Sequence, residues 1–89
     1  MDPQPQAQMN RYTATFFTHF AAQASFKKLC GGRIKARMCP VPRALSSSCG
    51  TCVRYEAETP ARELLHRDAE AVYLEGETGE YILLWKNDS

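Results

Sequence analysis

The pattern of apolar and polar residues along this chain predicts five short strands, two of them from strict alternation. Residues 33–39, "RIKARMC", alternate cleanly, as expected of a strand with one buried and one exposed side. The polar side of that strand carries Arg33, Lys35, Arg37 and Cys39. Residues 51–56, "TCVRYE", alternate in the same way and place Cys52 and Arg54 on the polar side. Aromatic and β-branched residues at 12–17, 71–75 and 80–86 predict three further strands, the last two joined into a hairpin by "GETG".

Two segments show helical spacing instead. Residues 18–31 begin at a capping residue, Thr18, and carry one apolar face made of Ala22, Phe26, Leu29 and Cys30, which predicts that Cys30 is buried. Gly31 and Gly32 should end this helix, because glycine adopts the left-handed conformation of a helix C-terminus at little cost. Residues 59–68 open with Thr59-Pro60, a typical helix start, and continue with an apolar stripe.

The resulting order, β-α-β-β-α-β-β, predicts an α+β protein. Its first six elements match the ferredoxin-like, split β-α-β arrangement, in which two helices cover one face of an antiparallel sheet. The hairpin at the C-terminal end adds to that sheet. The other face of the sheet stays open and is expected to be basic, with Arg33, Lys35, Arg37 and Arg54.

Length and composition are those of one small domain. The chain has 89 residues, of which 44% are hydrophobic and 24% charged, and we expect residues 11–89 to fold as a single unit. Residues 1–10, "MDPQPQAQMN", are polar and are expected to form a disordered tail. They lack the pattern of a signal peptide, and no apolar run approaches the roughly 20 residues of a membrane helix. We therefore expect a cytoplasmic protein with no membrane contact, whose cysteines are reduced.

Charge is distributed unevenly between the two parts of the chain. Residues 1–54 hold eight basic residues and one acidic residue, a net charge of +7, whereas residues 55–89 hold three basic and nine acidic residues, a net charge of −6. Two explanations remain open: the parts neutralise each other in the fold, or a basic face binds an acidic protein or RNA.

Three of the four cysteines fall within "CPVPRALSSSCGTC", residues 39–52. A zinc site is not expected, because zinc ribbons and knuckles usually present two CxxC-like pairs and here only Cys49 and Cys52 form one. The two histidines, His19 and His66, lie far from the loop in sequence. We predict no cofactor. A thioredoxin-like centre is also disfavoured, since "CGTC" runs into a strand and lacks the helix N-terminus that lowers a thiol pKa.

A cysteine that carries sulfur needs an accessible thiol on a loop. The loop between the strands at 33–39 and 51–56 provides this, because Gly50 can adopt unusual backbone angles that expose Cys49. Arg43 and the hydroxyls of Ser46, Ser47 and Ser48 are candidate donors to a thiolate or persulfide anion; the serines are equally typical of turn capping. At the base of the loop, Cys39 is expected to face Cys49, with Cys52 a few residues inside the strand.

The segment "PVPRALSSSCG" followed by "VRYE" resembles the core motif of a family of small bacterial selenium/sulfur carrier protein-like domains. The likeness extends over roughly residues 12–73, including the helix "THFAAQASFKKL" and the segment "PARELL". By this resemblance Cys49 is the signature cysteine, and its loop is formed by Pro40, Pro42, Arg43, Ser46, Ser47, Ser48 and Gly50. The resemblance implies a sulfur- or selenium-donating enzyme and an acceptor protein as partners.

A second resemblance is to small sulfur carriers with a CPxP signature, which "CPVP" at 39–42 matches. It implies a short helix over residues 41–47 and makes Cys39 the carrying thiol, but the few residues before the next cysteine leave no room for the long helix of that family. We therefore place Cys49 ahead of Cys39.

Three functions follow from these observations. The first is a non-enzymatic thiol carrier, with Cys49 as the sulfur-carrying thiol and Cys39 and Cys52 as resolving thiols through a Cys39–Cys49 or Cys49–Cys52 disulfide. The second is a binding module that uses the basic face for an acidic protein; RNA is the weaker form, because no aromatic residues for base stacking are evident beside the basic ones. The third is a thiol redox or sensor protein.

Overall fold

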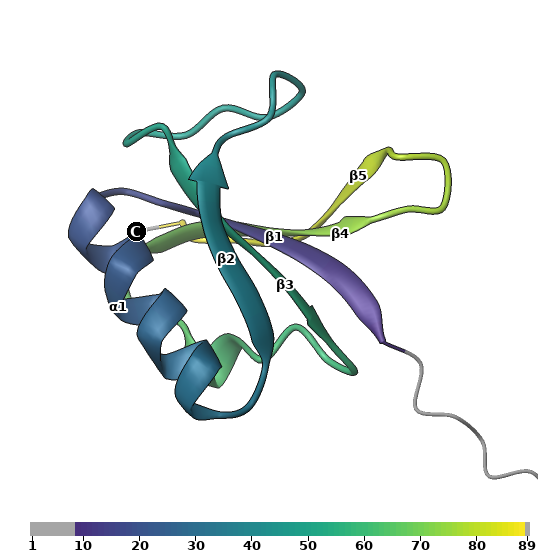
Figure 1. The fold of residues 1–89 in the computed structure, drawn as a ribbon. Helices are drawn as coiled ribbons and strands as arrows, with labels where there is room; N and C mark the ends of the chain where they lie inside the picture. The colour runs from purple at the N-terminus through teal and green to yellow at the C-terminus, as the bar shows by residue number, and fades with distance from the viewer. Residues whose placement is uncertain (1–8, 89) are drawn as a thin grey trace, which may run out of the picture.

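Five antiparallel strands form one sheet in the structure, a computed structural model that describes residues 9–88. The elements, in chain order, are β1 (Asn10–Phe16), α1 (His19–Gly31), β2 (Lys35–Pro40), β3 (Thr51–Ala57), the single 3₁₀ turn η1 (Arg62–Leu64), β4 (Ala69–Glu75) and β5 (Tyr81–Lys86). The strand order in the sheet is β2-β3-β1-β4-β5, with β1 in the centre (Figure 1). The α+β class and the antiparallel sheet are as predicted. None of the helices within residues 9–88 is long and apolar enough to cross a membrane.

The core lies between the sheet and α1, which packs against β1, β2 and β3 (Figure 1). Phe16 and Leu29 are fully buried there, and Tyr12 stacks on Tyr55 with ring centroids 5.4 Å apart. The alternation of β2 is as predicted. Its apolar residues pack against the core, while its basic ones, Lys35 and Arg37, are exposed on the opposite face.

Helix α1 begins as the sequence predicts. The Thr18 hydroxyl accepts a hydrogen bond from the backbone N–H of Ala21 at 3.0 Å. Its C-terminus differs from the prediction, because Gly32 is not left-handed (φ −87°, ψ 13°) and the left-handed residue is Arg33, at φ 64°. Arg33 therefore lies in the turn before β2 and not on the strand. Cys30, predicted to be buried, is exposed.

The predicted helix over residues 59–68 is wrong. Only the turn η1 forms, because Ala61 takes a left-handed conformation (φ 53°) and Leu65 is extended. Tertiary hydrogen bonds fix this path: the Tyr55 hydroxyl donates to the Pro60 carbonyl, and the His66 N–H donates to the Ser25 hydroxyl at 2.8 Å. With one helix in residues 9–88, the two-helix ferredoxin-like arrangement is not confirmed.

The two ends of the described chain join the same sheet. Strand β1 begins at Asn10, the last residue of the predicted tail, while residues 1–8 of that tail lie outside the described residues. The C-terminal hairpin is confirmed, since β4 pairs with β5 and the Gly76 N–H donates to the Glu80 carbonyl at 2.7 Å. Gly79, at φ 87°, supplies the left-handed residue of its turn.

Candidate functional site: the cysteine loop and the polar face of the sheet

Residues 41–50 connect β2 to β3 as a loop that is fastened to the body of the protein. The Ser47 hydroxyl donates to the Phe16 carbonyl at 3.1 Å. The Ser48 N–H and hydroxyl donate to the two carboxylate oxygens of Glu70, at 3.2 and 3.3 Å. Two of the three serines predicted as donors to a sulfur anion are thus used to anchor the loop. The short helix over 41–47 is wrong as well, because this segment contains only a turn closed by the Leu45 N–H and the Pro42 carbonyl.

Cys49 lies at the end of this loop, half-buried against the hydrophobic core. Its thiol donates to the carbonyl of Thr51 at 3.4 Å. The Thr51 hydroxyl lies 3.4 Å from Nδ1 of His19, the first residue of α1, so the cysteine shares a neighbour with the helix start. Gly50, at φ 76°, makes the bend that follows, in the left-handed region that glycine tolerates best.

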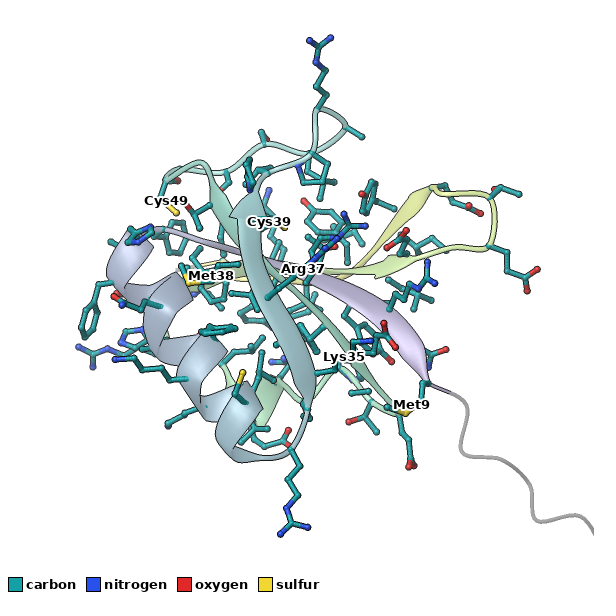
Figure 2. The ribbon with its side chains drawn as sticks, in the orientation of Figure 1. Met9, Lys35, Arg37, Met38, Cys39 and Cys49 are labelled. Atoms are coloured by element: carbon teal, nitrogen blue, oxygen red, sulfur yellow. The ribbon has the colours of Figure 1, made fainter. Side chains whose placement is uncertain are left out.

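Cys39 faces Cys52, and the prediction that it faces Cys49 is wrong. The register pairs Cys39 on β2 directly with Cys52 on β3, and their sulfur atoms are 3.5 Å apart. Figure 2 shows Cys49 and Cys39 on either side of β2. The site thus contains two separate thiol positions: a single cysteine on the side of α1, and a cross-strand pair on the polar face of the sheet.

The two members of the pair differ in exposure. Cys39 is half-buried, whereas Cys52 is fully buried and its thiol also lies 3.6 Å from the Pro40 carbonyl. Burial, followed by the hydrogen bond and charge of Cys39, raises the pKa of Cys52 from 9.0 to about 12; the nearby Arg54 opposes this only in part. At neutral pH Cys52 is therefore a protonated thiol.

This raised pKa gives a prediction for stability. The unfolded chain releases the Cys52 proton near pH 9 and the folded chain keeps it to about pH 12, so Cys52 stabilises the fold below this window and the contribution is lost as the pH rises through it. One such group lowers the free energy of unfolding by at most about 1.4 kcal/mol per pH unit. In urea titrations between pH 8.5 and 11, Cys52→Ala should flatten the decline, and Cys30→Ala, which removes an exposed thiol, is the matched control. Parallel curves for all three proteins would refute the assignment.

Basic residues continue along the polar face beyond the cysteine pair. Arg37 pairs with Arg54 two positions further along the same register, which is the next pair on this face, and Arg54 forms a 2.8 Å ion pair with Glu75 that raises its pKa. A cavity of about 410 Å³ opens here, lined by Arg11, Tyr12, Lys35, Ala36, Arg37, Arg54, Tyr55, Glu56 and Glu75. Three of the four predicted basic residues line it and Arg33 does not; Arg43 is exposed in the cysteine loop.

Sequence reasoning missed several residues of this face. The register places Tyr73 beside Thr13, and Tyr81 beside Glu75, on the same side as Arg54, so aromatic residues do accompany the basic ones. Thr13 and Thr15 are fully buried here, and neither hydroxyl has a hydrogen-bond partner among the described residues. The alternation of β1, "YTATF", placed both threonines on one side, but only the strand order brings that side next to the cysteines.

The comparison with family models decides which proteins this chain is related to. The family described as "Putative Se/S carrier protein-like" matches residues 11–71. The chain belongs to this family. The matched region runs from β1 into β4, so it contains the loop and Cys39, Cys49 and Cys52, and it ends before β5. No curated protein and no solved structure matches the chain.

Proposed function

We propose that this protein is a thiol carrier that accepts a sulfane sulfur or selenium atom on Cys49 and passes it to an acceptor. In the first step the Cys49 thiolate attacks the outer sulfur of a persulfide on a donor enzyme. A bond forms from Cys49 Sγ to that sulfur, and the donor cysteine leaves as a thiolate. The acceptor thiolate then takes the outer sulfur from Cys49 in the same way, which restores the Cys49 thiolate.

Membership in the carrier-like family supports the general function, and the thiol arrangement supports the choice of cysteine. One observation carries the proposal. The Cys49 thiol donates a hydrogen bond to a backbone carbonyl, whereas the thiols of Cys39 and Cys52 contact each other. The Cys49 thiol is thus held by the Thr51 carbonyl and not by another thiol, which leaves it available to accept sulfur. Cys30 is exposed on α1, away from the loop in sequence.

The contacts around Cys49 allow the loop to keep its shape while the thiol accepts and releases a sulfur or selenium atom. Ser47 and Ser48 hold the loop to β1 and β4, so loading needs only the weak sulfur–carbonyl contact at Thr51 to break. Arg43 and Ser46, both exposed, remain the loop groups free to approach an anionic persulfide or the partner that delivers it.

Donor and acceptor are expected to be proteins, and the basic face with Lys35, Arg37 and Arg54 is our candidate for the surface that one of them contacts. In each cycle the Cys49 thiol is converted to a persulfide and then regenerated, and the transfer needs no cofactor. The donor enzyme determines whether the atom that Cys49 carries is sulfur or selenium.

The test is direct loading. The wild-type protein is incubated with a cysteine desulfurase and cysteine, blocked with an alkylating reagent, and analysed by intact mass and peptide mapping. We expect the mass of one added sulfur atom, located on the peptide that contains Cys49. Addition of sulfur elsewhere, or none with an active desulfurase, would refute the proposal.

A further inference from the structure

We propose that Cys39 and Cys52 form a dithiol redox site on the polar face of the sheet, which an anionic low-molecular-weight disulfide oxidises to a cross-strand disulfide. This site is separate from Cys49 and does not depend on the carrier function. The sulfur atoms already lie 3.5 Å apart in the reduced protein.

The backbone can accommodate the bond. The Val41 N–H donates to the Gly50 carbonyl at 3.1 Å, so positions 41 and 50 are a hydrogen-bonded pair. Antiparallel ladders alternate, which makes Cys39 and Cys52 a hydrogen-bonded pair too, with Cα atoms about 5.5 Å apart. That separation falls inside the range of about 4.4–6.8 Å found for disulfides.

The asymmetry of the pair assigns the two roles. Cys39 is the accessible thiol and meets the incoming disulfide, and the buried Cys52 completes the reaction from inside the sheet. Thr15 lies directly opposite Cys52 on β1, fully buried, with a hydroxyl that has no partner among the described residues. We assign Thr15 as a positioning residue, a donor for the sulfur that becomes negatively charged when Cys52 ionises.

The neighbouring charges select the oxidant. Arg37 lies two residues before Cys39 on β2, and Arg54 lies two residues after Cys52 on β3. Both are on the same face as the cysteines and about 7 Å from them along the strands. They line the cavity of about 410 Å³ together with Lys35 and Arg11, against two carboxylates, Glu56 and Glu75. A small disulfide with carboxylate groups can place those groups in the cavity while its sulfur atoms reach Cys39.

The reaction balances with that disulfide as the only oxidant. The Cys39 thiolate attacks one of its sulfur atoms, forms a mixed disulfide and releases the first small thiolate. Cys52 then loses its proton to water and attacks Cys39 Sγ, forming the cross-strand disulfide and releasing the second small thiolate. The two protein thiols lose two electrons, the small disulfide gains them, and the two protons end on the small thiols.

Oxidised glutathione, which is anionic, and cystamine, which is cationic, are the probes. Wild-type protein is treated with each at neutral pH without a sulfur donor, quenched with an alkylating reagent and mapped by non-reducing mass spectrometry. We expect a Cys39–Cys52 disulfide, preceded by a transient glutathione adduct on Cys39. Oxidation by glutathione disulfide should be about tenfold slower in Arg37→Ser, while oxidation by cystamine should not be slowed. A Cys39–Cys49 or Cys49–Cys52 product, or a stable adduct on Cys39 without closure, would overturn the proposal.

Matched variants separate the two steps. Cys30→Ser/Cys49→Ser keeps only the proposed pair and should close fully, whereas Cys30→Ser/Cys52→Ser should stop at the mixed disulfide. Thr15→Val should leave the first step unchanged and move the pH dependence of the second step to higher pH; an unchanged pH profile would remove Thr15 from the site. Because no desulfurase is present, failure of Cys49 loading and failure of this pair are distinguishable.

Discussion

Replacing Cys49 by serine is expected to abolish the addition of sulfur by a desulfurase. A serine hydroxyl is not ionised at neutral pH and forms no persulfide, so the loss should be complete rather than partial. The loop should keep its shape, because its anchors are Ser47 and Ser48 and not the cysteine. Loading is measured as the fraction of protein that carries one additional sulfur atom in the intact mass spectrum.

Two control variants make this result specific. Cys30→Ser removes an exposed thiol on α1 and should load like the wild type. Cys39→Ser removes the accessible member of the cross-strand pair and should also load, because the sulfur of Cys39 lies against Cys52 on the neighbouring strand. If Cys49→Ser still loads while Cys39→Ser does not, the carrying thiol is Cys39, as in the CPxP carriers, and our assignment is wrong.

The alternation of residues was a reliable guide to which side of the sheet each residue occupies. It placed Cys39 and Arg37 on the polar side of one strand and Cys52 and Arg54 on the polar side of the next, as observed. The alternation could not provide the register of β2 and β3. The register depends on how many residues between the strands belong to the loop and how many pair across the ladder. The missed signal was Pro40: it has no N–H, so it belongs at a non-hydrogen-bonded position of the ladder, which restricts the pairing of Cys39.

The wrong helix over residues 59–68 has a physical cause, which is tertiary contact overriding local preference. Thr59-Pro60 followed by an apolar stripe favours a helix locally, but the Tyr55 hydroxyl and the Ser25 side chain bind the backbone at Pro60 and His66 and hold the segment in another path. Those donors and acceptors are more than four residues away in sequence. A periodicity argument does not include them.

The largest effect on stability is expected for Phe16→Ala. The Phe16 side chain is fully buried at the end of β1, and truncating a buried phenylalanine costs about 3–5 kcal/mol. Domains of this size have about 5–15 kcal/mol of total stability, so the variant should lose a large part of it. The matched control is Phe20→Ala, since Phe20 is 69% exposed and makes one edge contact with His66. Urea unfolding should show a much lower midpoint for the first variant and a nearly unchanged one for the second.

This substitution also tests how the carrier loop is held. The Ser47 hydroxyl donates a hydrogen bond to the backbone carbonyl of residue 16, and alanine has the same carbonyl. This anchor of the loop should therefore persist in the folded Phe16→Ala protein. The rate at which a limiting reagent alkylates Cys49 should therefore rise only in proportion to the unfolded fraction measured in the same urea series. A Cys49 rate that rises in the folded variant would mean that the Phe16 side chain itself holds the loop. Equal stability losses in Phe16→Ala and Phe20→Ala would contradict the placement of the core between α1 and the sheet.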